Sequence, residues 1–357
     1  MKTIATSLGT LLLATLAGAP APGSAPGAPP AASDGVPAAA DRAGGSPFVD
    51  AHTHLDPREP RRSIQAALQG MVRENVARIV FMPPPSTFED PARYDAEVFL
   101  GALRGQEEKL RFLGGGGSLN ALVQRAVRDN DAGPEVQRRF RARAEEILRS
   151  GAAGFGELAA EHFQGATPYQ SAPPDHPLFR LLADIAAEHG VPIDLHMEAV
   201  PEAMALPAGL SSPPNPPRLA ANVDALERLL AHNPRARIVW AHAGWDNTGY
   251  RTPALCRRLL RAHPNLYMDV KVDPANPGKN PPLADGASGA LRPEWLELFR
   301  DFPERFVLGS DQHYPEPAAG LERAEAVRRL FAALPPELRR KMGMENAARL
   351  YFHRQGH

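Results

Sequence analysis

The chain has 357 residues, of which 43% are hydrophobic, enough to bury a sizeable core in one large domain or two small ones. Its 40 Lys and Arg residues nearly balance its 41 Asp and Glu residues, so the formal net charge is −1. This balance gives no electrostatic reason to expect a nucleic acid or an acidic membrane surface as a partner. The single cysteine, Cys256, excludes an internal disulfide and a cluster of thiolate metal ligands.

The first 21 residues have the pattern of a secretory signal peptide. Lys2 supplies a positive start, an apolar run follows from Ile4 to Ala17, and small residues up to Ala21 offer cleavage sites. The apolar run is short for a membrane span, although an N-terminal anchor that stays attached is the alternative. We therefore expect an exported protein, periplasmic or secreted, with no stable membrane insertion after signal removal.

Residues 22–46 are rich in Ala, Pro and Gly, which is typical of a linker, and the folded domain is expected over residues 47–357. Within this domain, short apolar runs rich in strand-forming residues alternate with amphipathic segments. Eight such runs are predicted strands: 48–55, 77–83, 110–117, 152–159, 191–198, 237–244, 265–271 and 305–313.

Two of the intervening segments show helical spacing most clearly. Residues 176–190 place Leu178, Leu181, Leu182 and Ile185 at helical spacing and end at Gly190, a typical C-terminal stop. Residues 218–234 repeat the pattern with Leu219, Val223, Leu226 and Leu230.

Eight strands that each precede a helical segment predict a parallel sheet closed into a (β/α)8 barrel, also called a TIM barrel. An open doubly wound sheet is the alternative. Such a sheet normally carries a Gly-rich dinucleotide loop after its first strand, whereas this chain has His-Thr-His at residues 52–54.

Residues that commonly ligate metals stand at the ends of five predicted strands. In a barrel these ends meet on one face, where active sites lie. Side chains two residues apart on a strand point to the same face, so His52 and His54 can hold one cation together. Each residue alone is equally compatible with a structural role, but the joint pattern predicts a metal site at His52, His54, Glu157, His196, His242 and Asp311.

The same motifs resemble the amidohydrolase superfamily, and in particular its amidohydrolase-related branch, also called amidohydrolase type 2. The resemblance covers residues 48–353 and rests on DAHTHL, HMEA, WAHAGW, GSDQH and ENAARLYF. It implies a barrel enzyme with one or two divalent ions, zinc foremost, bound by His52, His54, His196, His242 and Asp311. Many two-metal members carry a carboxylated lysine at the end of the fourth strand. This chain has Glu157 there, either as a bridging ligand or as a lone polar residue of a one-metal site.

The resemblance also suggests how the site would act on a small-molecule substrate. A divalent ion lowers the pKa of water towards neutrality, and a carboxylate beside the ion can hold the released proton. Asp311 is the candidate for that carboxylate, and His242 is a candidate for stabilising a developing oxyanion. Candidate substrate contacts are Lys271, His313, Tyr314 and Glu198, with a barrel ion pair as the alternative role for Lys271.

We therefore expect a metal-dependent hydrolase of an amide, lactone, ester or phosphoester. A metal-dependent decarboxylase of a small aromatic or unsaturated acid is the main alternative, because that branch also contains such lyases. A non-catalytic metal-binding protein is disfavoured by the aspartate at residue 311, and a nuclease by the neutral charge. The sequence leaves the oligomeric state open.

Overall fold

A computed structural model describes residues 46–89, 95–165, 167–273, 283–284, 290–315 and 322–352. The predicted signal peptide at residues 1–21 and all but the last residue of the predicted linker lie outside these ranges, so both stay predictions. The described α-helices are α1 (Pro60–Glu74), α2 (Leu100–Leu103), α3 (Leu119–Asp129), α4 (Pro134–Arg149), α5 (Pro177–His189), α6 (Val223–His232), α7 (Pro253–Ala262), α8 (Pro293–Asp301), α9 (Glu322–Ala333), α10 (Pro336–Arg340) and α11 (Asn346–Tyr351).

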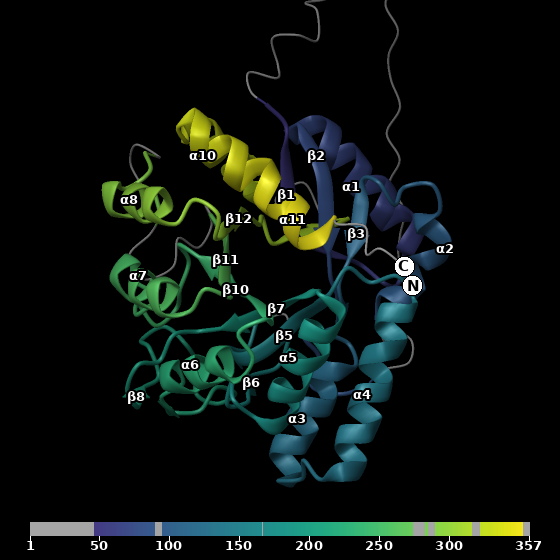
Figure 1. Ribbon diagram of the computed structural model, residues 1–357, viewed down its shortest axis with the longest axis vertical. Coiled ribbons are helices and arrows are strands. Elements are labelled where there is room, and N and C mark those ends of the chain that lie inside the picture. The colour runs from purple at the N-terminus through teal and green to yellow at the C-terminus, as the bar shows by residue number, and fades with distance from the viewer. Residues whose placement is uncertain are drawn as a thin grey trace, which may run out of the picture. The chain divides into compact units, whose positions relative to one another are not determined.

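The strands form one main sheet in which every pairing between the predicted barrel strands is parallel (Figure 1). All eight runs predicted from the sequence contain a strand of this sheet, so that prediction is confirmed. These strands are β1 (Phe48–Leu55), β2 (Val76–Phe81), β3 (Leu110–Phe112), β4 (Gly114–Gly115), β5 (Phe155–His162), β7 (Pro192–Met197), β10 (Arg237–Ala243), β11 (Leu266–Val270) and β12 (Phe306–Leu308).

The order of pairing leads around a ring. The path runs β3-β2-β1-β12-β11-β10-β7-β5-β4, and its two ends, β3 and β4, are separated along the chain by Leu113 alone. The backbone continues the ladder across this gap, because the Leu113 N–H donates to Phe81 O and the Gly114 N–H to Gly154 O. Residues 110–115 thus act as one strand between β2 and β5, which gives the eight strand positions expected of the barrel.

The described residues also form short strands in addition to this ring. β13 (Gln312–Tyr314) pairs with the end of β1, and β6 (Gln170–Ser171) pairs with β5. A separate hairpin-like pair joins β8 (Met204–Ala205) to β9 (Arg218–Leu219). Leu219 therefore belongs to a strand, and the helix predicted over residues 218–234 starts later, at Val223, as α6. The helical spacing of Leu219 was misleading because Leu219 packs instead with Phe163 and Val200.

Helices flank the ring and bury apolar faces against it. In α5, Leu178, Leu182 and Ile185 of the predicted set are buried, whereas Leu181 is half-buried. Gly190 ends the helix with a φ of 64°. A residue with a side chain is rarely found in this left-handed conformation, which explains the glycine. None of the helices within the described part of the chain is both long and apolar enough to cross a membrane.

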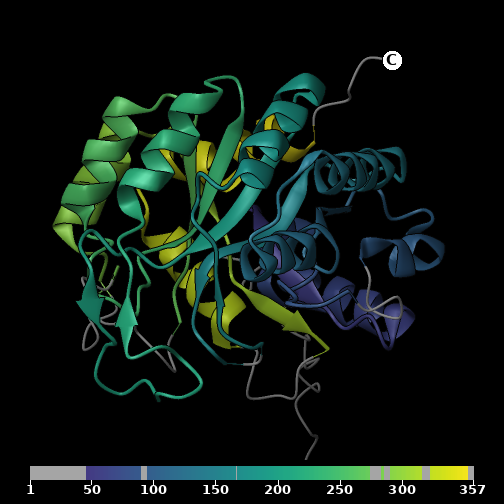
Figure 2. The same ribbon diagram turned by 90° about the horizontal axis from the view of Figure 1, so that it is seen from below.

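The end of the barrel opposite the predicted site is apolar. Val49, Val80, Val239 and Val307 from four strands pack with Tyr351 of the C-terminal helix α11, all of them buried. Figure 2 shows the C-terminal helices, in yellow, lying against the strands. This apolar base leaves the carboxyl ends of the strands for polar side chains, as in other barrels of this type.

Candidate metal centre

Local shifts in strand register aim three of the predicted ligands into the barrel. From Asp50 to Thr53, β1 advances by three residues while its partner β2 advances by two, from Ile79 to Phe81. The same excess of one residue occurs in β5 between Phe155 and Leu158, and in β10 between Trp240 and Ala243. Such bulges re-aim side chains. They lie at His52, Glu157 and His242.

In β1 the bulge changes which residues face inward. Val49 and Ala51 belong to the apolar interior, so strict alternation would turn His52 away from it. Because of the extra residue, His52 instead joins His54 on the inner side, where both imidazoles approach Glu157. The expected pair of inward-facing histidines, His52 and His54, is therefore present. It results from the bulge as well as from the alternation of side chains along the strand.

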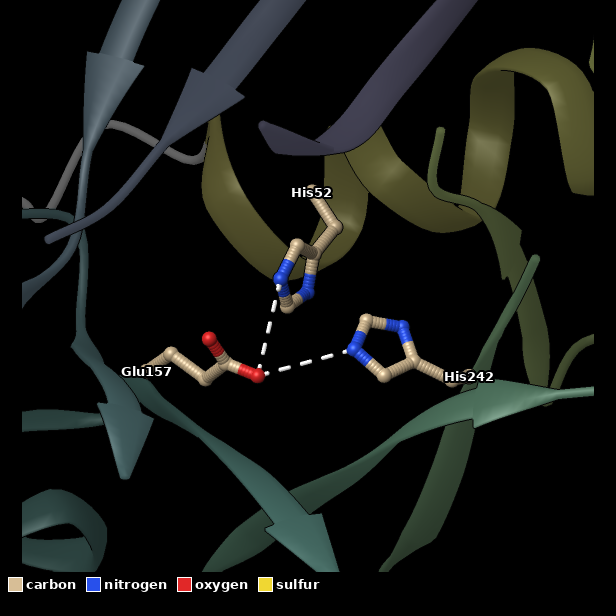
Figure 3. Close-up of side chains that lie close together, drawn as sticks. All are labelled: His52, Glu157 and His242. Carbon is tan, nitrogen blue, oxygen red and sulfur yellow. Dashed lines mark ion pairs between the residues drawn. The ribbon is translucent and has the colours of Figure 1, made fainter. Parts of the chain in front are cut away.

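Glu157 lies among four imidazoles. Figure 3 shows it with two of them, His52 and His242. Its Oε1 atom is 2.9 Å from His196 Nδ1 and 3.5 Å from His242 Nε2. The same oxygen is 3.9 Å from His52 Nε2, and Oε2 is 3.5 Å from His54 Nε2. The Glu157 side chain is only 4% exposed, so its charge depends on these rings for compensation.

Asp311 closes the other side of the cluster. Its Oδ1 atom is 3.1 Å from His54 Nε2 and 3.9 Å from His52 Nε2. Its Oδ2 atom is 2.6 Å from Lys271 Nζ and 3.2 Å from a guanidinium nitrogen of Arg323. One oxygen therefore faces the imidazoles, while the other is neutralised by two cations.

The backbone holds two of these residues in conformations that side chains rarely adopt. His242 has a φ of 71° and Asp311 a φ of 55°. Non-glycine residues with such angles are uncommon and concentrate at functional sites. The His242 N–H donates to Asp269 and the Asp311 N–H to the His52 carbonyl, which fixes both turns.

Electrostatics keep the carboxylates of the two predicted acidic ligands, Glu157 and Asp311, ionised. Burial acts to raise the pKa of Glu157, but hydrogen bonds from His196 and His242 and the charge of His52 hold it well below its usual value. Burial also acts to raise the pKa of Asp311, but the Lys271 charge and the His54 contact hold it well below the usual value. Ionised carboxylates beside imidazoles are the donor types that zinc-like cations prefer.

The cluster fits a divalent cation on its own geometry. His52 Nε2 is buried and has no hydrogen-bond partner among the described residues, although it faces two carboxylates. An unpaired buried nitrogen of this kind is costly unless something else binds it. Among the described residues there are three groups in which all the ligand atoms lie within 4.8 Å of one another. They are His52 with Glu157 and His242, His52 with His54 and Asp311, and His52 with Asp194 and Asp269.

Sequence reasoning missed Asp194 and Asp269. Both are fully buried, and each has an Oδ2 atom 3.4 Å from His52 Nδ1. A signal was available, since each is a lone acidic residue inside an apolar strand, two positions before His196 and Lys271 respectively. Buried charges in such positions need a partner, and His52 is that partner.

The structure separates the four predicted substrate contacts. Lys271 forms the ion pair with Asp311 and also lies 4.1 Å from the centre of the Trp245 ring. The His313 ring lies 4.5 Å from the His54 ring, beside the cluster. Glu198 is buried and accepts hydrogen bonds from the backbone and side chain of Asn247.

Tyr314 lies elsewhere. Its ring belongs to the core outside the barrel and lies against Gly70 of α1, where an added Cβ would come within 2.8 Å of the Tyr314 hydroxyl. The structure therefore does not bring Tyr314 to the cluster. Its neighbour His313 is on the opposite side of β13, as expected for adjacent residues of a strand.

His196 differs from the other imidazoles in how it faces Glu157. Its Nδ1 atom contacts Glu157, whereas its Nε2 atom lies 3.8 Å from Glu198 Oε1. His196 is also packed against His162, with 4.4 Å between ring centres. It is part of the cluster as predicted, but it belongs to none of the three groups of ligand atoms found among the described residues.

Comparison with known proteins agrees with this architecture. A sequence family described as amidohydrolase matches residues 49–352 of the chain. Comparison with curated proteins found no match.

Solved structures show the same fold at low sequence identity. A candidate amidohydrolase from Staphylococcus aureus has 13% identity and a TM-score of 0.51, over 86% of this chain and 99% of that one. A 2,6-dihydroxybenzoate decarboxylase in complex with 2,6-dihydroxybenzoate has 14% identity and a TM-score of 0.51, over 87% and 100%.

Removing His54 is expected to release metal from the protein. The His54→Ala variant should lose affinity by more than the roughly 10–100-fold typical of an outer contact, because His54 Nε2 faces both carboxylates. The matched control is His232→Ala, since His232 contacts Asp184 on the outside of the barrel. Zinc content after dialysis is the measurement, and equal retention in the two variants would remove His54 from the site.

Proposed function

The chain belongs to the amidohydrolase family, and on that premise we propose that it is a metal-dependent hydrolase of an amide, lactone, ester or phosphoester. Enzymes of this family act on small-molecule substrates. The observation that carries the proposal is the buried Glu157 carboxylate among four imidazoles, with Asp311 beside it, at the carboxyl ends of the barrel strands.

The family is metal-dependent, and we propose zinc as the ion because the available donors are imidazole nitrogens and carboxylate oxygens. His52, His54, Glu157, His242 and Asp311 would hold it, with His196 either as a further ligand or as a support for Glu157. A bound divalent ion would polarise the scissile group and lower the pKa of water in the site.

Asp311 is the proposed proton acceptor. Lys271 keeps its carboxylate ionised at neutral pH, the state that an acceptor requires, and leaves Oδ1 directed at the imidazole cluster. The contact with Lys271 also stops the carboxylate from turning, since Oδ2 is held at 2.6 Å. Asp311 would take a proton from water and return it to the leaving group.

Other side chains around the cluster have proposed roles in binding. In a site that holds one ion through His52, His54 and Asp311, His242 would instead donate from Nε2 to the developing oxyanion. His313 and Lys271 stand beside His54 and Asp311 and are proposed substrate contacts. Glu198 is proposed to act on substrate only through His196, because its oxygens are already occupied by Asn247.

An activity screen tests this proposal. Zinc-loaded protein is offered lactones, amides, phosphoesters and aromatic acids, and hydrolysis products are expected. Release of carbon dioxide from an aromatic or unsaturated acid would show a decarboxylase instead. Asp311→Asn should lower turnover by about 10²-fold or more while the protein stays folded and metal-bound, as expected for loss of a general base. Asp301→Asn, at the exposed end of α8, is the control.

We also propose that Glu157 bridges two ions. His52, His54 and Asp311 form one group of ligand atoms, and His52, Glu157 and His242 form another. Titration of metal-free protein with zinc should give a stoichiometry near two, dropping to near one in Glu157→Gln. Glu161→Gln is the matched control, because Glu161 is on the same strand and equally buried but contacts Tyr169 and Ser171. A stoichiometry of one in the unmodified protein would contradict the bridge.

Export to the periplasm or the medium is a further proposal, supported by Lys2 and the apolar run that follows it. The mature protein is expected to lack about the first 20 residues, which is typical of a cleaved signal. N-terminal sequencing of protein recovered outside the cytoplasm is the measurement, and an intact Met1 would argue against cleavage.

A further inference from the structure

Asp269 is a buried aspartate that contacts two imidazoles from different strands. Its Oδ2 atom lies 3.4 Å from His52 Nδ1, and its Oδ1 atom lies 3.5 Å from His242 Nδ1. The Oδ1 atom also accepts a hydrogen bond of 2.9 Å from the His242 N–H. Asp269 is fully buried on β11, so these contacts are made away from water.

A glycine makes this arrangement possible. Asp269 and His52 stand on β11 and β1, which are separated in the sheet by β12. Gly309 follows β12 directly, and a Cβ there would lie 2.8 Å from His52 Cβ and 3.0 Å from Asp269 Oδ1. Any larger residue at position 309 would therefore push the carboxylate and the imidazole apart.

The two imidazoles present the same nitrogen to the cluster. His52 Nε2 and His242 Nε2 both face Glu157 Oε1, while their Nδ1 atoms both face Asp269. An imidazole that binds a cation through Nε2 keeps its proton on Nδ1, and a buried Nδ1–H needs an acceptor. Two carboxylate oxygens can accept from both rings and from one backbone N–H, because a carboxylate offers about four acceptor positions.

We propose that Asp269 is a positioning residue that fixes the orientation and the tautomer of two metal ligands, His52 and His242, at once. The inference deepens the proposed metal site and rests on it. In this arrangement the His52 nitrogen that faces Asp194 and Asp269 carries a proton and not a cation, so Asp269 itself does not touch the cation or the substrate. It acts through the two rings, keeping the proton on each Nδ1 so that each Nε2 lone pair is directed into the cluster.

Asp194 provides an internal comparison. It is equally buried and its Oδ2 atom lies 3.4 Å from His52 Nδ1, but among the described contacts it meets no other ligand imidazole. Removing its charge leaves His52 with Asp269 as an acceptor. The same substitution in Asp269 leaves an amide with one accepting oxygen and one donating nitrogen, which cannot serve two Nδ1–H groups.

The unmodified protein gives the first test. Zinc-loaded protein labelled with ¹⁵N in histidine is observed by NMR, which distinguishes Nε2 coordination from Nδ1 coordination. His52 and His242 are both expected to bind zinc through Nε2 and to carry a protected Nδ1–H. Coordination through Nδ1 in either ring would overturn the inference without any substitution.

Three variants give the second test. Asp269→Asn should remove or shift the Nδ1–H signals of both rings and lower zinc affinity by about 10–100-fold, as for loss of an outer partner of ligands. Gly309→Ala should shift the His52 signal by pushing the ring from Asp269. Asp194→Asn should alter only the His52 signal and lower affinity by less than about tenfold.

The outcomes distinguish a failure of the inference about Asp269 from a failure of the proposed metal site. Asp269 is not the positioning residue if the Asp269→Asn variant keeps the Nδ1–H signals of both His52 and His242 and binds zinc within about twofold of the unmodified protein. A change of about twofold is well below the effect of losing an outer partner. If the unmodified protein binds no zinc, the proposed metal site is wrong and the inference falls with it. Circular dichroism of each variant identifies a loss of fold, and in that event the pattern in the unmodified protein decides.

Discussion

The structure depends on the pairing of buried charges at one end of the barrel. Glu157, Asp194, Asp269 and Asp311 bring four carboxylates into a region where each is at most 9% exposed. Leaving such groups unpaired away from water would cost several kcal/mol each. The imidazoles of β1, β7 and β10 and the ammonium group of Lys271 provide the compensation. Parallel strands that close into a ring bring these side chains together, since each strand contributes its carboxyl end.

The same ring separates this charged layer from an apolar base. Below the cluster the inward side chains are Val49, Val80, Val239 and Val307, which pack on α11. The change from apolar to polar occurs within single strands, and in β1, β5 and β10 it coincides with a one-residue bulge. A bulge lets a strand that packs tightly at its start present a ligand at its end. The apolar base can therefore stabilise the fold, while the carboxyl ends of the strands hold the side chains of the proposed metal site.

Hydrophobic periodicity was sufficient to predict the eight strands and the residues at their ends. It could not predict the bulges, because they arise from pairing with neighbouring strands and leave no local pattern. Asp194 and Asp269 were missed because each looks like an ordinary polar interruption until His52 is placed beside it. Tyr314 was misplaced because its distance along the chain from Asp311 is short, whereas its side chain points to α1. Contacts with elements distant along the chain, either neighbouring strands or α1, decided all these cases.

The position of His196 affects how the predicted ligands would be shared between the two ions of the proposed site. The sequence predicts both His196 and His242 as ligands of one or two ions. In the structure Nδ1 of His196 contacts Glu157 and Nε2 faces Glu198, so this imidazole links two carboxylates. The ligand atoms gathered near His242 instead come from His52 and Glu157. His52 thus belongs to each of the three groups of ligand atoms found among the described residues. In the proposed metal site, its orientation would decide whether one or two ions can be held. For that reason we propose that Asp194 and Asp269, which lie behind His52, govern metal binding at the site together with the residues that face the cluster.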